Sequence, residues 1–114
     1  MKKVLVKVKK ANPNAKMPLY ATDGAAGFDF YALDSCTIPA GEVIKIPTGL
    51  CMEIKPGYLI KIVSRSGLAF KGIYHMESII DSDYRGEMHF ILFNTTKQDF
   101  HIEKGDRIAQ GLLM

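Results

Sequence analysis

The chain has 114 residues, of which 47% are hydrophobic and 24% charged, a balance typical of one globular domain spanning residues 1–114. Its net charge of +3 is too small to indicate a nucleic-acid partner, and no apolar run approaches the roughly 20 residues of a membrane span. The alternating N-terminus lacks the apolar block of a signal peptide, so we expect a cytoplasmic protein. A core of this modest size would gain stability from association with other copies.

Alternation of apolar and polar residues predicts an all-β chain. Turn residues such as Pro39-Ala40-Gly41 and Lys55-Pro56-Gly57 recur about every 8–12 residues, which is typical of a β-sandwich or β-barrel. A short helical turn is expected at residues 66–70. Strands are expected, in chain order, at residues 4–9, 28–32, 36–38, 43–46, 50–54, 58–63, 88–93, 100–102 and 108–114.

The most informative stretch places Asp81 and Asp83 between apolar flanks, with Tyr84 directly behind them. If this stretch is extended, both carboxylates point to the same face, because strand side chains repeat every two residues. Burial of an unpaired charge is costly, so two acids on one face more often hold a metal, a water or a cation than serve a core.

Two other segments have the chemistry to bind phosphate. Arg65-Ser66-Gly67 follows a strand and combines a guanidinium fork, a hydroxyl donor and a glycine that allows close backbone approach. Gln110 could donate its amide to a phosphate oxygen. The alternatives are a plain polar turn at the first segment, and a hairpin with a structural Asp106–Arg107 pair near the second.

Asp29 lies between two phenylalanines, behind a run of small residues. It is either a structural acid paired with an arginine or an outer-shell partner of a metal-bound water, and both interpretations stay open. The dispersed histidines lack metal-ligand spacing. No pattern of a serine or cysteine nucleophile is evident, which favours direct attack by water over a covalent mechanism.

Taken together and in order, four segments resemble the motifs of the trimeric deoxyuridine triphosphatase (dUTPase) family. The resemblance runs from about Leu19 to the last residue, and four motifs in the right order are far more specific than one. The segments are residues 26–32 (AGFDFYA), 65–69 (RSGLA), 80–87 (IDSDYRGE) and 105–110 (GDRIAQ).

The resemblance implies a β jelly-roll that assembles as a homotrimer with active sites at subunit interfaces. It also implies hydrolysis of dUTP to dUMP and pyrophosphate with magnesium. Net charge and the lack of a long apolar run argue for no nucleic-acid and no membrane partner. Magnesium and hydrogen-bond donors suit this chemistry, since three phosphates repel a nucleophile.

The resemblance assigns roles to single residues. Asp81 takes the position of the acid that activates the attacking water; the alternative is that Asp83 acts and Asp81 is structural. Tyr84 takes the position of the ring that packs on the deoxyribose, the alternative being an ordinary core aromatic. Asp29 matches the acid associated with the metal's water shell. The phosphate-binding positions are occupied by Arg65, Ser66, Gly67 and Gln110.

Two features depart from the family pattern. Ser78 occupies a position that often holds glycine, in the hairpin of residues 72–80 that reads uracil, and His75 is the candidate for a contact with the base edge. The chain stops at Met114, before the family's C-terminal strand and the glycine-rich arm that closes over the nucleotide. Either those residues lie outside this sequence or the chain is truly short, in which case the lack of lid closure would lower turnover.

Other classes of function remain as alternatives. The chain could be a nucleotide- or protein-binding regulatory protein on the same scaffold with little turnover. A dCTP deaminase has a similar fold, but its second motif usually differs from the one found here. A small β scaffold without a site does not explain why each polar cluster suits a triphosphate.

Overall fold

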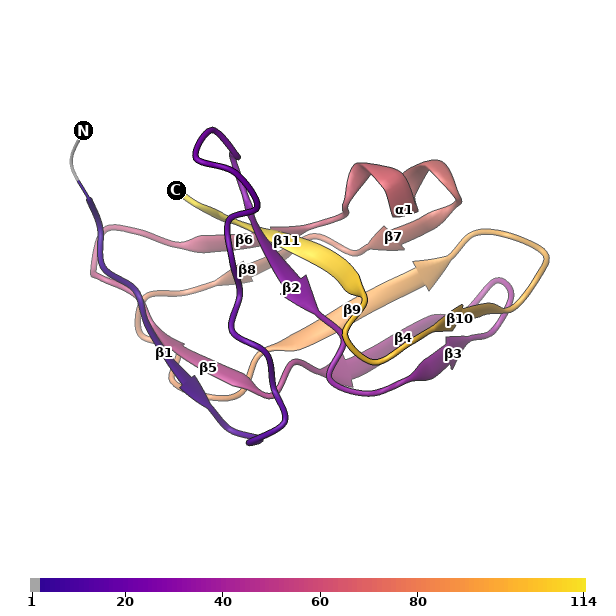
Figure 1. Cartoon of the computed structure of the whole chain (residues 1–114), viewed down its shortest axis with the longest axis horizontal. Coiled ribbons are helices and arrows are strands. Elements are labelled where there is room, and N and C mark those ends of the chain that lie inside the picture. The colour runs from indigo at the N-terminus through magenta and orange to yellow at the C-terminus, as the bar shows by residue number, and fades with distance from the viewer. Residues whose placement is uncertain (1–2) are drawn as a thin grey trace.

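The computed structural model describes residues 3–114, and nearly all of the regular structure in that range is β-strand (Figure 1). The paired strands run antiparallel. The elements are β1 (Lys7–Lys10), β2 (Phe28–Tyr31), β3 (Cys36–Ile38), β4 (Val43–Pro47), β5 (Leu50–Glu53), β6 (Ile60–Val63), α1 (Ser66–Phe70), β7 (Ile73–His75), β8 (Ser78–Ile80), β9 (His89–Asn94), β10 (Phe100–Ile102) and β11 (Arg107–Leu113).

The strands form small sheets with the orders β1-β5, β3-β10, β4-β9-β7 and β2-β11-β6-β8. Sheet neighbours come from distant parts of the sequence, as where β2 pairs with β11. Such long-range antiparallel pairing confirms the all-β, jelly-roll-like fold that the sequence predicts. Within residues 3–114, no helix has the length and apolar character that crossing a bilayer requires.

The predicted strands and the helical turn at Ser66–Phe70 are confirmed, with strand ends shifted by a few residues. Two strands, β7 and β8, were not predicted from the residue pattern; they lie in the 72–80 segment where the resemblance implies a hairpin, and they pair with β9 and β6. Each has only three residues, which carry a weak period of two, although β3 and β10 have the same length and were predicted.

The core is centred on β9, whose residues alternate between half-buried and fully buried. Phe90 and Leu92 point inward, and the Phe90 ring packs edge-on against Phe30 of β2 with 5.8 Å between ring centroids. Burial of each phenylalanine contributes roughly 1.5–3 kcal/mol. This contact joins the β4-β9-β7 sheet to the four-stranded sheet that carries most candidate site residues.

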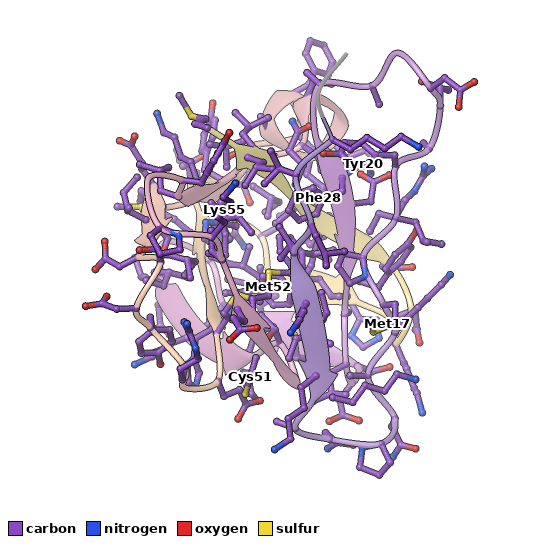
Figure 2. The ribbon with its side chains drawn as sticks, turned by 90° about the vertical axis from the view of Figure 1, so that its left-hand side faces the viewer. Met17, Tyr20, Phe28, Cys51, Met52 and Lys55 are labelled. Atoms are coloured by element: carbon purple, nitrogen blue, oxygen red, sulfur yellow. The ribbon has the colours of Figure 1, made fainter. Side chains whose placement is uncertain are left out.

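The side of the molecule seen in Figure 2 contains an apolar hollow among its charged side chains, and this hollow lies apart from those residues. Tyr20 packs edge-on against Phe28 with 5.5 Å between ring centroids, and Met52 of β5 is almost fully buried nearby. The hollow has a volume of about 300 Å³ and lies between the N-terminal segment and Phe28. None of the residues that line it belongs to the predicted site.

Candidate active site

Four polar residues meet where β2, β11 and β6 lie side by side, and we call them the Asp29 cluster: Asp29, Arg65, Arg107 and Gln110. The β2–β11 register sets Gln110 opposite Asp29, and the β11–β6 register sets Gln110 opposite Val63. Arg65 therefore comes to the same place, just beyond the end of β6. The sheet register thus gathers residues from three predicted motifs.

Asp29 is nearly buried and is paired with two arginines. Its Oδ1 accepts from Arg65 Nε at 3.2 Å, and its Oδ2 lies 3.7 Å from Arg107 Nη1. The expectation that Asp29 pairs with an arginine is confirmed, whereas the suggested Asp106–Arg107 pair does not form. Asp106 instead accepts from the Glu103 N–H at 2.9 Å. Sequence reasoning missed the role of Arg107, because its proximity to Asp29 arises only from strand pairing.

Gln110 is held rigidly inside this cluster. Its amide nitrogen donates to the Ser64 carbonyl at 2.9 Å. A Cβ on Gly27 would lie 2.7 Å from Gln110 Oε1, so the glycine makes room for the amide. An amide nitrogen has two N–H donors, which leaves one for an incoming acceptor.

Ser66 and Gly67 are exposed at the start of α1, next to this cluster. A hollow of about 370 Å³ adjoins them, and cationic side chains from Arg65, Lys71 and Arg107 line it. Asp29 offsets only part of the charge of its two arginines. The cluster therefore keeps a net positive charge and spare donors, the combination that binds phosphate oxygens.

The second part of the predicted site is the segment between β8 and β9, residues 81–88, which we call the Asp81 loop. The sequence left open whether this stretch is extended, and the structure shows that it is not, so Asp81 and Asp83 do not share one face of a strand. The chain turns here, and the Tyr84 N–H donates to the Asp81 carbonyl at 3.1 Å. Asp81 is exposed, and within residues 3–114 its carboxylate has no hydrogen-bond or ion-pair partner.

Tyr84 lies across its own loop. Its hydroxyl donates to the Glu87 carbonyl at 2.8 Å, and a Cβ on Gly86 would lie 2.6 Å from the hydroxyl oxygen. The ring is 43% exposed, so it is not a core aromatic. It borders a hollow of about 220 Å³ whose lining also includes Asp81 and Ile80.

The structure does not support the suggested base contact of His75, because this side chain is buried and both ring nitrogens are occupied. Nδ1 lies 2.6 Å from the Met76 carbonyl, and Nε2 accepts from the Ile91 N–H at 3.1 Å. This pattern requires a neutral ring with its proton on Nδ1. Burial lowers the pKa of His75, although the hydrogen bond to Met76 acts in the opposite direction.

This geometry makes stability depend on pH. The pKa of His75 is lower in the folded than in the unfolded chain, so the unfolded chain binds the extra proton first as the pH falls. The free energy of unfolding should therefore decline below about pH 6.5, by at most about 1.4 kcal/mol per pH unit for one proton, and the decline should end once folded His75 is protonated.

Urea unfolding between pH 5 and 7.5, compared for wild type, His75→Gln and His89→Gln, checks this expectation. The steep part of the decline should disappear in His75→Gln and persist in His89→Gln, which retains His75. An unchanged slope in His75→Gln would show that another group causes the decline.

The Asp29 cluster and the Asp81 loop do not meet within one chain. The β6–β8 register pairs Ile60 with Ile80, which sets Asp81 alongside Leu59, whereas Arg65 follows the other end of β6. Six residues at about 3.3 Å each separate the two positions by roughly 20 Å. In Figure 1, α1 lies at the right and the β8–β9 segment at the lower left. The two halves can act together only if different copies of the chain supply them.

A resident metal site is not evident in residues 3–114, where no group of three or more His, Cys, Asp or Glu side chains is arranged to hold an ion. Magnesium in nucleotide sites is held mainly by phosphate oxygens and waters, with few carboxylates. Asp29, with both oxygens already facing arginines, fits an acceptor for metal-bound water better than a direct ligand. The residues thus fit a magnesium ion that arrives with a triphosphate.

Comparisons with known proteins agree with this chemistry. The dUTPase family model matches residues 13–114. A deoxyuridine 5'-triphosphate nucleotidohydrolase of Helicobacter pylori (strain P12) is 39% identical over 111 residues, 95% of this chain and 77% of the relative. The enzyme of the same name from Paramecium bursaria Chlorella virus 1 is 45% identical over 107 residues, 93% of this chain and 76% of the relative.

Solved structures show the same fold. A mutant dUTPase from phage phi11 of S. aureus, described with a structural Mg(II) ion, has a TM-score of 0.90 at 23% identity and covers 96% of this chain and 90% of that chain. A mutant dUTPase of Staphylococcus bacteriophage 80alpha with dUpNHpp has a TM-score of 0.91 at 23% identity and covers 96% of this chain and 89% of that chain. On the match to the family model and the identity to these relatives, the chain belongs to the dUTPase family.

Proposed function

We propose that the chain hydrolyses dUTP to dUMP and pyrophosphate. Family membership over residues 13–114 supports this activity. The structural observation that carries the proposal is the Asp29 cluster, where two guanidiniums and a fixed amide surround a single carboxylate and retain donors for a triphosphate. A cytoplasmic location is part of the proposal, since the substrate is a dissolved nucleotide.

The Asp81 loop supplies the second half of the reaction in this proposal. Asp81 accepts a proton from the water that attacks the α-phosphate, and its carboxylate, exposed and without a partner within residues 3–114, suits a general base. Tyr84 packs on the deoxyribose and leaves no space for a 2'-hydroxyl. Its ring is held for this purpose by the hydrogen bond from its hydroxyl to Glu87.

The phosphates lie, in this proposal, against Arg65, Ser66, Gly67 and Gln110. Arg107 adds a second guanidinium that the sequence did not suggest. Magnesium, bound with the substrate, would offset phosphate charge and favour an in-line geometry. Asp29 would accept hydrogen bonds from waters of that ion.

We further propose a homotrimer in which one copy supplies the Asp29 cluster and a neighbour supplies the Asp81 loop. The opposite placement of the two halves along β6 supports this arrangement. Closed symmetric rings give every copy the same contact and every interface one complete site.

The activity is tested by incubating the purified chain with dUTP and measuring dUMP and pyrophosphate. Equal amounts of both products should form with magnesium, and chelation by EDTA should abolish most of the turnover. UTP and dCTP serve as matched controls and should react far more slowly. Nucleotide binding without pyrophosphate release would favour the regulatory alternative, and ammonia release from dCTP would favour a deaminase.

A further inference from the structure

The Asp81 loop is fastened at its far end to the turn between β4 and β5. Gly49 N–H donates to Glu87 Oε2 at 2.9 Å. Immediately beside this bond, the Met88 N–H donates to the Leu50 carbonyl, and the Thr48 hydroxyl donates to the Met88 carbonyl at 2.8 Å. These bonds fix the position from which the loop enters β9. The Glu87 side-chain bond is the one nearest the loop.

The donor in this tie is rigid. Gly49 has a φ of +75°, which a side chain would disfavour, and a Cβ here would lie 2.9 Å from the Cβ of Ala15. The Gly49 carbonyl accepts from the N–H groups of Ala11 and Asn12 at 2.8 and 3.2 Å, which holds the turn and the direction of its N–H. A carboxylate accepts such a bond more strongly than a neutral group does.

Glu87 accepts two hydrogen bonds, one through its side chain and one through its backbone carbonyl. Its side chain accepts from the turn, while its own carbonyl accepts the Tyr84 hydroxyl at 2.8 Å. Glu87 has no ion pair within residues 3–114, so its charge is not used to hold a cation. Gly86 leaves the space that the tyrosine hydroxyl occupies.

We propose that Glu87 is a positioning residue for Tyr84: its carboxylate, bound to the Gly49 N–H, acts together with the Met88 N–H of the same peptide to fix the carbonyl that orients the tyrosine ring. The role of that ring in sugar selection rests on the proposed function. The positioning itself is a property of this loop. The Met88 N–H of the same peptide stays bound to the Leu50 carbonyl, so loss of the side-chain bond should let the Glu87 carbonyl tilt without freeing it. The ring should then exclude a 2'-hydroxyl less well.

The kinetic test compares kcat/KM for dUTP with kcat/KM for UTP. Glu87→Ala should lower this ratio about tenfold, the scale of a loosened contact in a specificity pocket. Glu87→Gln keeps an oxygen that can accept from Gly49, and should restore most of the ratio. Exposed Glu42→Ala is the matched control and should leave the ratio unchanged. A variant that merely folded poorly would lower both rates and not their ratio.

A second readout needs no activity. Tyrosines are replaced by 3-fluorotyrosine, and the ¹⁹F signal of residue 84 is assigned from the Tyr84→Phe variant. In Glu87→Ala this signal should move toward that of an exposed, mobile tyrosine, and in Glu87→Gln it should stay near its wild-type position. Gly86→Ala, whose Cβ would crowd the hydroxyl, should also displace it.

The two readouts separate the proposals. If the wild type does not hydrolyse dUTP, the proposed function fails, and the ¹⁹F signal alone decides the role of Glu87. A wild-type signal in Glu87→Ala, or an unchanged dUTP-to-UTP ratio in an active Glu87→Ala enzyme, would overturn the positioning role.

Discussion

Asp81→Asn should reduce the rate of dUTP hydrolysis by about 10²–10⁴-fold, the usual contribution of a general base. The amide has nearly the shape of the carboxylate but cannot take a proton from water at neutral pH. The Asp81 side chain is exposed and has no partner within residues 3–114, so the substitution should cost little stability. Pyrophosphate release under saturating dUTP measures kcat, and isothermal titration with a non-hydrolysable dUTP analogue measures affinity.

Asp83→Asn is the matched control, because it changes the same charge in the same loop. It should retain most of the turnover. The converse result, with near-normal turnover in Asp81→Asn and loss in Asp83→Asn, would reverse the two roles. Comparable losses in both variants would show that the loop needs its negative charge but has no single base.

The strands could be predicted from the sequence because their patterning is local. The alternation in β9 is visible in the residue types, and so are the proline and glycine turns that bound β4 and β5. The site residues Arg65, Asp81 and Gln110 could be named because four short motifs keep their order. Strands of three residues carry little pattern: β3 and β10 were predicted, whereas β7 was not.

The contacts among these residues could not be predicted, because they depend on register between distant strands. The Asp29–Arg107 proximity follows from the pairing of β2 with β11, and the sequence offered Asp106 as the partner of Arg107 instead. His75 was predicted to contact the base edge. It lies instead at the end of β7, where pairing with β9 places its side chain in the core. Local patterns reveal which residues carry chemistry, and long-range pairing decides which of them meet.

Mixing two inactive variants can decide whether the site lies within one chain or is shared between copies. Arg65→Gln removes a phosphate donor from the Asp29 cluster, and Asp81→Asn removes the base from the loop. Each variant alone should be nearly inactive. If they are unfolded together in equal amounts and refolded together, mixed assemblies will form in which some interfaces join an intact cluster to an intact loop.

Random mixing gives each interface an intact cluster with a chance of one half and an intact loop with the same chance, so about a quarter of wild-type turnover should return. The variants refolded separately and then combined without exchange are the control, and should stay inactive. If the two halves worked within one chain, no mixture could restore activity, since every copy carries one defect. Because Arg65 follows one end of β6 and Asp81 follows Ile80, which pairs with the other end, recovery is the result that the proposed trimer predicts.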